Sequence, residues 1–369
     1  MAGRRPAAMR VLIVRLRALG DVIHALPVAC AIRDALPGAW IAWLAEEPAR
    51  PLLADHPAID RCVSVPRGWA RSPAALAALR RALRAERFDV VLDLQGVRAS
   101  VLASWLAGAP RRLSFIGMLS HQLRHRIRDE DRLRALSRLC ARPLGVELVT
   151  ATRAHIVDRY LEILAPLGVA APRVRFGLRE SPADAADAER AVARMRLAPG
   201  GYALLHPGGA PHKLWPADRF AVVARHLAAG WRLPSVVLQG PGEGERQAAE
   251  DVVAASDGSA RLAPPLTLAQ LAALARRARL FLGAESGPLH LAAAVGAPCI
   301  GLVGHVAVAR FRPYGDGNVA VAGSPIPVEQ ASRDGRGAAA MAAIDPALVC
   351  RACDQLLQPG GRAAMSREP

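Results

Sequence analysis

Short apolar runs alternate with longer segments whose apolar positions recur every three or four residues. In the first half, buried strands are predicted at residues 11–15, 40–44, 61–65 and 88–92. One helix follows Gly20-Asp21 and ends at Pro37-Gly38, and a second, rich in Ala, Leu and Arg, spans residues 73–84. Strands that alternate with helices are typical of β-α-β units, so we predict a parallel sheet covered by helices.

The alternation restarts after a Pro/Gly-rich connection at residues 165–182. Strands are predicted at 202–205, 235–238, 280–282 and 299–303, and helices from 216, from 243, and at 267–277, 288–295 and 345–357. Between the halves, the basic stretch 118–150 is predicted to be helix or partly loop, and 155–164 an amphipathic helix. The pattern therefore predicts two α/β domains joined by a linker.

Composition fits two folded domains. The chain has 369 residues, of which 52% are hydrophobic and 22% charged, which excludes a disordered protein. Its 48 basic and 32 acidic residues give a net charge of +16, which suggests an anionic partner. Lys213 is the one lysine, and so many arginines indicate GC-rich coding, so part of this charge carries no function. Aromatic residues make up 4% and no nucleic-acid motif is present, so we expect no nucleic-acid partner.

The cysteines and the apolar runs bear on the compartment. Six cysteines in this length do not make a disulfide framework, and the pair Cys350 and Cys353 lacks the second pair that a metal site needs. We interpret that pair as structural. No run reaches the 20 or so apolar residues of a membrane span, and the first run is interrupted by Arg15 and Arg17, too early for a signal peptide. We expect a cytoplasmic protein.

Ligands of open parallel sheets bind beyond the carboxyl ends of the strands, so we expect functional residues in the loops that follow them. In the first loop, residues 15–24, Gly20 permits a tight turn and Asp21 falls where a helix begins. Asp21 could cap that helix, act in chemistry, or do both.

Two loops of the second half suit an anion. In residues 206–216, Gly208 and Gly209 let backbone N–H groups approach a phosphate, and Lys213 adds a charge; the alternative is an ordinary Gly/Pro connection. In residues 283–290, a helix is predicted to start at about Pro288, so the N–H groups of Ser286 and Gly287 would point at an anion. Glu285 can accept hydrogen bonds from sugar hydroxyls. Alternatively, Ser286 is only an N-cap and His290 a packed first-turn histidine. The P-loop, G-x-G-x-x-G, G-x-S-x-G and H-E-x-x-H motifs are all absent.

Taken together, the chain resembles glycosyltransferase family 9, the ADP-heptose:lipopolysaccharide heptosyltransferase family. The motifs that carry the resemblance run in order along nearly the whole chain: VLIVRLRALGDVIHALP, FDVVLDLQG, RRLSFIG, HIVDRYLEILAPLGV, HPGGAPHKLWP, FLGAESGPLHLAAAVGAP, PYG and AIDPALV. The resemblance implies a GT-B fold, in which two Rossmann-like parallel-sheet domains face a central cleft. It assigns residues 1–178 to an acceptor-binding domain, 179–344 to a nucleotide-sugar-binding domain, and 345–369 to a C-terminal helix and frayed tail.

The resemblance also implies an inverting, metal-independent transferase with no cofactor, whose co-substrate is a nucleotide sugar such as ADP-heptose. Asp21 would be the general base, and Lys213 would meet the donor phosphates. The other implied donor-binding residues are Gly208, Gly209, Glu285, Ser286, Gly287 and His290, with either Glu243 or Glu245 on the nucleoside. The implied acceptor-binding residues are Arg15, Arg17, Gly20, His24, Arg111 and Arg112.

The implied acceptor is a lipopolysaccharide-type or other phosphorylated glycolipid at the inner face of the inner membrane, where the protein would be peripheral. The arginines of the first half would form a cradle for it, or only a solvated helix face: Arg111, Arg112, Arg124, Arg126, Arg128 and Arg134. The chain departs from the family at Glu285-Ser286, where members carry Asp-Thr, at residues 304–308, and at Arg17-Ala18. These departures leave open a non-catalytic GT-B protein that binds a sugar nucleotide or glycolipid without turnover.

Overall fold

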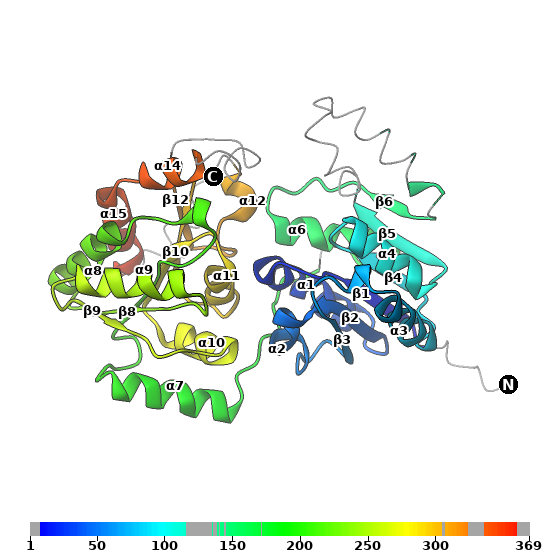
Figure 1. Cartoon of the computed structure of the whole chain (residues 1–369), viewed down its shortest axis with the longest axis horizontal. Coiled ribbons are helices and arrows are strands. Elements are labelled where there is room, and N and C mark those ends of the chain that lie inside the picture. The colour runs from blue at the N-terminus through cyan, green and yellow to red at the C-terminus, as the bar shows by residue number, and fades with distance from the viewer. Residues whose placement is uncertain are drawn as a thin grey trace. The chain divides into compact units, whose positions relative to one another are not determined.

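The computed structural model describes residues 8–115, 135, 139, 141–143, 145–170, 172–304, 307–323 and 336–359. The chain divides into two compact units, Met1–Arg179 and Glu180–Pro369. Each unit is built around a six-stranded sheet whose strand pairs are all parallel (Figure 1). The chain is therefore a pair of doubly wound α/β units, as the alternating pattern predicts.

The first unit has the strand order β3-β2-β1-β4-β5-β6. Its elements are β1 (Arg10–Val14), α1 (Leu19–Ala35), β2 (Trp40–Glu46), η1 (Glu47–Ala49), α2 (Arg50–Leu53), β3 (Arg61–Val65), η2 (Trp69–Arg71), α3 (Pro73–Ala85), β4 (Val90–Asp93), α4 (Arg98–Ala107), β5 (Arg111–Phe115), β6 (Glu147–Val149), α6 (Ile156–Leu161) and η3 (Glu162–Leu167). On one face of the sheet, the apolar sides of α3 and α4 pack on β1 and β4. The central strands are apolar on both sides because helices cover both faces.

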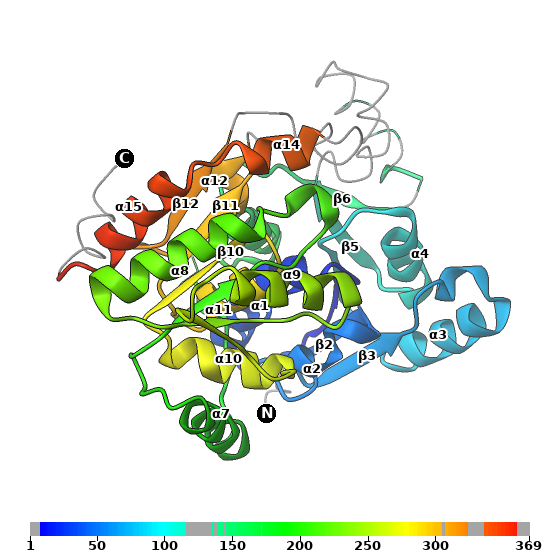
Figure 2. The same cartoon turned by 60° about the vertical axis from the view of Figure 1, so that its left-hand side comes forward.

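The second unit has the order β12-β11-β10-β7-β8-β9. Its elements are α7 (Pro182–Arg194), β7 (Ala203–His206), η4 (Pro211–Lys213), α8 (Ala217–Trp231), β8 (Ser235–Val237), α9 (Glu243–Ala254), β9 (Ala260–Leu262), α10 (Leu268–Arg277), β10 (Leu280–Ala284), α11 (Gly287–Ala294), β11 (Cys299–Val303), α12 (Val308–Phe311), β12 (Val319–Ala322), α14 (Arg336–Ala342) and α15 (Pro346–Leu357). Helices α8, α9 and α15 share one core with the sheet, and α7 packs on α10 (Figure 2).

In both units the direction of winding reverses beside the first strand. In the first unit β1 lies between β2 and β4, and in the second β7 lies between β8 and β10. The loops after β1 and β4, and those after β7 and β10, therefore diverge at the carboxyl edge of each sheet. Such a switch point is where doubly wound sheets bind ligands.

The connection between the units is held partly by the first one. Arg175 pairs with Asp34 on α1, with 2.8 Å between Nε and Oδ2, and His56 Nε2 lies 2.8 Å from the carbonyl oxygen of Phe176. Of the predicted linker 165–182, the part up to residue 179 thus packs as a tail of the first unit. The rest leads into α7, which the sequence analysis did not predict.

The C-terminal helix belongs to the second core. Cys350 and Cys353 of α15 are buried there and unpaired, and burial raises the pKa of the Cys350 thiol to about 11. This agrees with a structural rather than a redox role. In the part of the chain that the structure describes, no helix has the length and apolarity to cross a bilayer. Within the same residues, no cluster of three or more His, Cys, Asp or Glu could hold a metal ion.

Candidate active site

Asp21 lies in the first turn of α1, directly beyond the carboxyl end of the central strand β1. Its side chain is 33% exposed. Oδ2 accepts a hydrogen bond from the backbone N–H of Ala18, at 3.4 Å, and forms an ion pair with Arg15. Asp21 therefore caps its helix with one oxygen, and Oδ1 has no partner among the described residues.

The other candidates of this loop have different surroundings. Arg15 is buried, whereas the side chain of Arg17 is 62% exposed and lies 3.8 Å from Glu46. Gly20 is the second residue of α1 and has no positive φ, so it serves the helix start rather than a glycine-only turn. His24 lies one turn after Asp21, is 2% exposed, and meets His155 of α6 edge to face at 5.9 Å between ring centroids.

Arg111 and Arg112 are not brought close to this loop. They begin β5, and the parallel register pairs them with Val90 and Val91, at the amino end of the sheet. Arg111 instead makes a bidentate ion pair with Glu147 of β6, at 2.9 and 3.0 Å. Asp21 belongs to the carboxyl edge, so an acceptor group that contacts Asp21 does not also contact Arg111. Arg124, Arg126, Arg128 and Arg134 lie outside the described residues.

In the second unit, two motifs 72 residues apart meet at the switch point. Gly283 of β10 is in register with His206 of β7, so the loops after these strands lie side by side. Lys213 pairs with the carboxylate of Glu285 and lies 3.3 Å from its carbonyl oxygen. Glu285 also lies 3.2 Å from Nε2 of the buried His290. The side chains of Lys213 and Glu285 are 29% and 15% exposed, so this is a partly buried cluster with one ammonium and one carboxylate.

The start of α11 is open for an acceptor of hydrogen bonds. Ser286 is the N-cap of this helix, but its side chain makes no capping hydrogen bond. Its Oγ instead lies 3.5 Å from Nδ1 of His206. Burial lowers the pKa of His206 to about 4, so this imidazole is neutral at pH 7. The backbone N–H groups at the helix start carry the positive end of the helix dipole, which favours an anion.

The structure distinguishes the two glutamates of α9. Glu243 is 91% exposed, and its nearest ion-pair partner is Arg246 at 3.8 Å. Glu245 turns back toward the sheet, where a Cβ added at Gly208 would lie 3.2 Å from its Oε1 and one at Gly240 would collide with its carboxylate. Gly208 and Gly240 thus leave room for Glu245 at the carboxyl edge. Gly209 has φ of +148°, which only glycine adopts readily.

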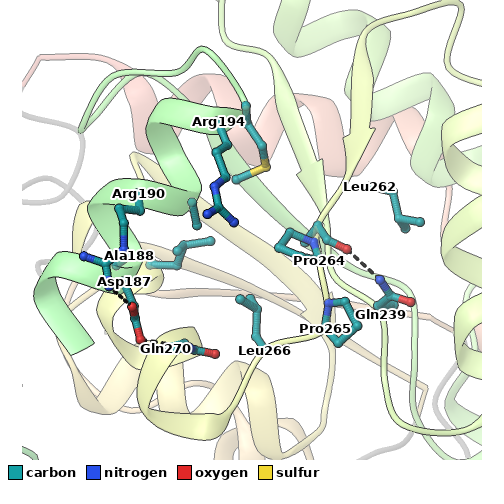
Figure 3. Close-up of a pocket in the computed structure, with 14 residues that line it drawn as sticks. Asp187, Ala188, Arg190, Arg194, Gln239, Leu262, Pro264, Pro265, Leu266 and Gln270 are labelled. Atoms are coloured by element: carbon teal, nitrogen blue, oxygen red, sulfur yellow. Dashed lines mark hydrogen bonds and ion pairs between the residues drawn. The ribbon is translucent and has the colours of Figure 1, made fainter. Parts of the chain in front are cut away.

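A pocket of about 610 Å³ continues this edge beyond Gln239, the residue before Gly240 (Figure 3). Its floor is the loop of Pro264, Pro265 and Leu266, and α7 forms one wall. The side chain of Arg194 extends from α7 toward the pocket, and the Gln239 amide donates a 2.6 Å hydrogen bond to the Ala263 carbonyl. An apolar floor with a guanidinium and amides at its margin suits a flat, polar-edged ring.

The sequence did not reveal the burial of His206, the pocket, or the inward orientation of the Arg15 side chain. His206 is the first residue of a recognised motif, so its position was visible in the sequence, but its burial was not. The pocket combines α7 with the loops after β8 and β9, and no contiguous motif signals it.

Comparison with solved structures shows the class of fold. The chain is similar to the glycosyl transferase family 9 from Veillonella parvula DSM 2008, with a TM-score of 0.77 and 23% identity over 95% of this chain and 97% of that one. It is also similar to the E. coli heptosyltransferase WaaC with ADP, with a TM-score of 0.69 and 22% identity over 94% and 100% of the two chains. The fold is therefore that of the GT-B glycosyltransferases.

The sequence pattern of Glycosyltransferase family 9 (heptosyltransferase) matches residues 76–334, more than half of the chain. The chain belongs to this family and is a glycosyltransferase. Lipopolysaccharide heptosyltransferase 1 of Escherichia coli K12 is 27% identical over 316 residues, covering 83% of this chain and 91% of the relative. The enzyme of the same name from Pseudomonas aeruginosa is 29% identical over 324 residues, covering 84% and 83%. The family resemblance in the motifs is thus confirmed.

Proposed function

We propose that the protein transfers a heptose, with inversion, from ADP-heptose to a lipopolysaccharide-type glycolipid acceptor. The observation that carries this proposal is the cluster of Lys213, Glu285, Ser286 and His290, assembled from two distant motifs at the switch point of the second sheet. Relatives named lipopolysaccharide heptosyltransferase, and a solved relative with ADP, support the choice of sugar, nucleotide and acceptor.

The donor is bound along the carboxyl edge of the second unit. The diphosphate lies at the start of α11, where it receives the N–H groups of Ser286 and Gly287 and the ammonium of Lys213. Glu285 accepts hydrogen bonds from the sugar, and Glu245 from the ribose. The nucleobase enters the neighbouring pocket between Arg194 and the floor of Pro264, Pro265 and Leu266. No metal or further cofactor takes part.

The reaction needs one proton acceptor and one stabilised leaving group. Oδ1 of Asp21 removes the proton of the acceptor hydroxyl while that oxygen bonds to the anomeric carbon. The bond from the anomeric carbon to the phosphate oxygen breaks on the opposite face, and the nucleoside diphosphate leaves with both electrons. Lys213 and the helix N–H groups stabilise the charge that develops on it. The mechanism combines general-base catalysis with a prearranged electrostatic site.

The acceptor is lipid-linked, so we place the protein at the inner face of the inner membrane, as a peripheral protein. Its excess of arginine suits an anionic membrane surface and a phosphorylated acceptor.

Two experiments test the proposal. In a thermal-shift panel of ADP, UDP, GDP and dTDP sugars, ADP-heptose should raise the melting temperature most, because a ligand that binds only the folded state stabilises it. Asp21→Asn should lower turnover by roughly 10²–10⁴, the range for a general base, while ADP binding measured by calorimetry stays as in the wild type. Full turnover in Asp21→Asn would show that the proton goes elsewhere. Absence of turnover in the wild type with every donor that binds would support the non-catalytic alternative.

A further inference from the structure

Arg15 is a charged side chain in the core of the first unit. It follows β1 directly and is only 7% exposed. Arginine is rarely buried to this degree unless its charge is matched by a partner. Sequence resemblance suggested Arg15 for the acceptor, which would need an exposed guanidinium. Its burial calls for another role.

The guanidinium of Arg15 joins two loops. One terminal nitrogen donates a 2.9 Å hydrogen bond to the carbonyl oxygen of Leu94, in the loop after β4. The other forms the ion pair with Oδ2 of Asp21. The carbon at the centre of the guanidinium lies 5.7 Å from the ring centroid of Tyr160, which is itself 2% exposed. Burial disfavours this charge, but Tyr160 and Asp21 raise the pKa of Arg15 above its ordinary value.

The loop after β4 is itself firmly held, so it can serve as a fixed support. Leu94 donates its N–H to Val14 of β1 at 3.0 Å, and the side chain of Gln95 accepts the N–H of Leu16 at 2.8 Å. The buried Asp93 receives the N–H groups of Gln95 and Gly96, both at 2.9 Å. Arg15 therefore connects Asp21 to a rigid loop on the neighbouring strand.

We propose that Arg15 is a positioning residue for Asp21: it fixes Oδ2 so that Oδ1 faces the acceptor hydroxyl. This inference rests on the proposed role of Asp21 as general base. Both described contacts of Asp21 use Oδ2, so the second oxygen is left for the proton. The guanidinium of Arg15 thus holds one oxygen of Asp21 and leaves the other for the acceptor hydroxyl.

The test is a double-mutant cycle on turnover, measured as heptose transfer from ADP-heptose to heptose-deficient lipopolysaccharide. Arg15→Gln should lower kcat by about 10- to 100-fold, the equivalent of one hydrogen bond to a charged group. Arg15→Lys keeps the charge but reaches only one of the two loops, so it should recover part of that loss. In the Asp21→Asn background, Arg15→Gln should cause no further loss, because a residue that acts only through Asp21 has nothing left to position.

Two controls separate positioning from a structural effect. Arg10, at the other end of β1, pairs with Glu86. Arg10→Gln removes a paired arginine from the strand that precedes Arg15 and should leave kcat unchanged. ADP binding by calorimetry should be unchanged in Arg15→Gln, because the donor residues belong to the other unit. If Arg15→Gln does not fold, as shown by its melting curve, the cycle is run with Arg15→Lys.

The outcomes distinguish the inference from the proposed function. Normal turnover in Asp21→Asn overturns the base assignment and the inference with it. A large loss in Asp21→Asn combined with normal turnover in Arg15→Gln overturns the inference alone. If the fold-losses in turnover of the two single variants multiply in the double variant, the inference is also overturned. Independent effects combine in this way, as a structural effect of Arg15 would. A loss in Arg15→Gln that disappears in the Asp21→Asn background establishes the positioning role.

Discussion

Replacing Lys213 by alanine tests the donor site most directly. Lys213 pairs with the carboxylate of Glu285 and lies 3.3 Å from the carbonyl oxygen of the same residue. An ammonium has three N–H donors, and these two contacts leave one of them without a partner among the described residues. We infer that this third donor meets a phosphate oxygen of the nucleotide.

The expected loss of ADP affinity in Lys213→Ala has two parts. The lost hydrogen bond to a charged group is worth about 1.5–3 kcal/mol. In addition, the variant leaves Glu285, 15% exposed, facing the diphosphate without the ammonium of Lys213 beside it. For like charges about 6 Å apart at an effective dielectric constant of about 20, the repulsion amounts to roughly 2–3 kcal/mol before partial exposure reduces it. Together these effects should weaken ADP binding by about 10²- to 10³-fold.

Calorimetric titration of ADP into four variants measures both parts. Lys213→Ala should show the full loss, and the double variant Lys213→Ala/Glu285→Gln should regain about 10-fold because the repulsion is gone. Lys213→Arg should recover only part of the affinity, since the charge returns but the compact shape does not. Arg225→Ala, which removes an arginine of α8 that lies 3.5 Å from Asp257, serves as the matched control.

Adenosine, which lacks phosphates, should bind all four variants as it binds the wild type. An ADP affinity of Lys213→Ala equal to that of the wild type would refute the reasoning and remove Lys213 from the site. A further loss in the double variant, in place of a gain, would show that Glu285 does not repel the diphosphate.

Three further predictions concern other regions. Glu245→Gln should weaken ADP binding about 10-fold, the effect of one hydrogen bond to a charged group, whereas Glu243→Gln should leave it within about twofold because that side chain is exposed; equal effects in calorimetry would contradict the assignment. Burial lowers the pKa of His206 to about 4, so only the unfolded state takes up its proton between pH 6.5 and 4. Chemical denaturation should therefore show wild-type stability falling over this range by roughly 3 kcal/mol more than that of His206→Asn; parallel pH profiles would contradict this. Co-sedimentation should show binding to anionic but not neutral vesicles. Replacing Arg124, Arg126 and Arg128 together by Gln should weaken that binding by about 10²-fold, at ~1 kcal/mol per basic residue; equal binding to both vesicle types would contradict a role of these arginines at a membrane.

The sequence was sufficient for the fold class and most central elements. The predicted strands 61–65 and 299–303 match β3 and β11, and the predicted helix 73–84 ends one residue before α3 does. These elements are readable because buried strands and amphipathic helices depend on the order of apolar residues within about a dozen positions. Four strands, β5, β6, β9 and β12, went unpredicted. The last three are partly exposed and three or four residues long, too short for a clear pattern. Residues 147–149, expected to be helix or loop, form β6.

The same division holds for the candidate site. Asp21, Lys213 and Glu285 could be recognised from sequence because the neighbours that make them chemically useful, a strand before and a helix after, are contiguous in the chain. Only the tertiary structure showed that Arg15 points inward onto Asp21, that Arg111 lies at the opposite edge of its sheet, and that Lys213 and Glu285 form a pair. Strand order and register decide such contacts, and they are set by packing between residues far apart in sequence. The local sequence pattern therefore determined which chemical groups this protein carries. The packing within each of its two units determined which of these groups meet.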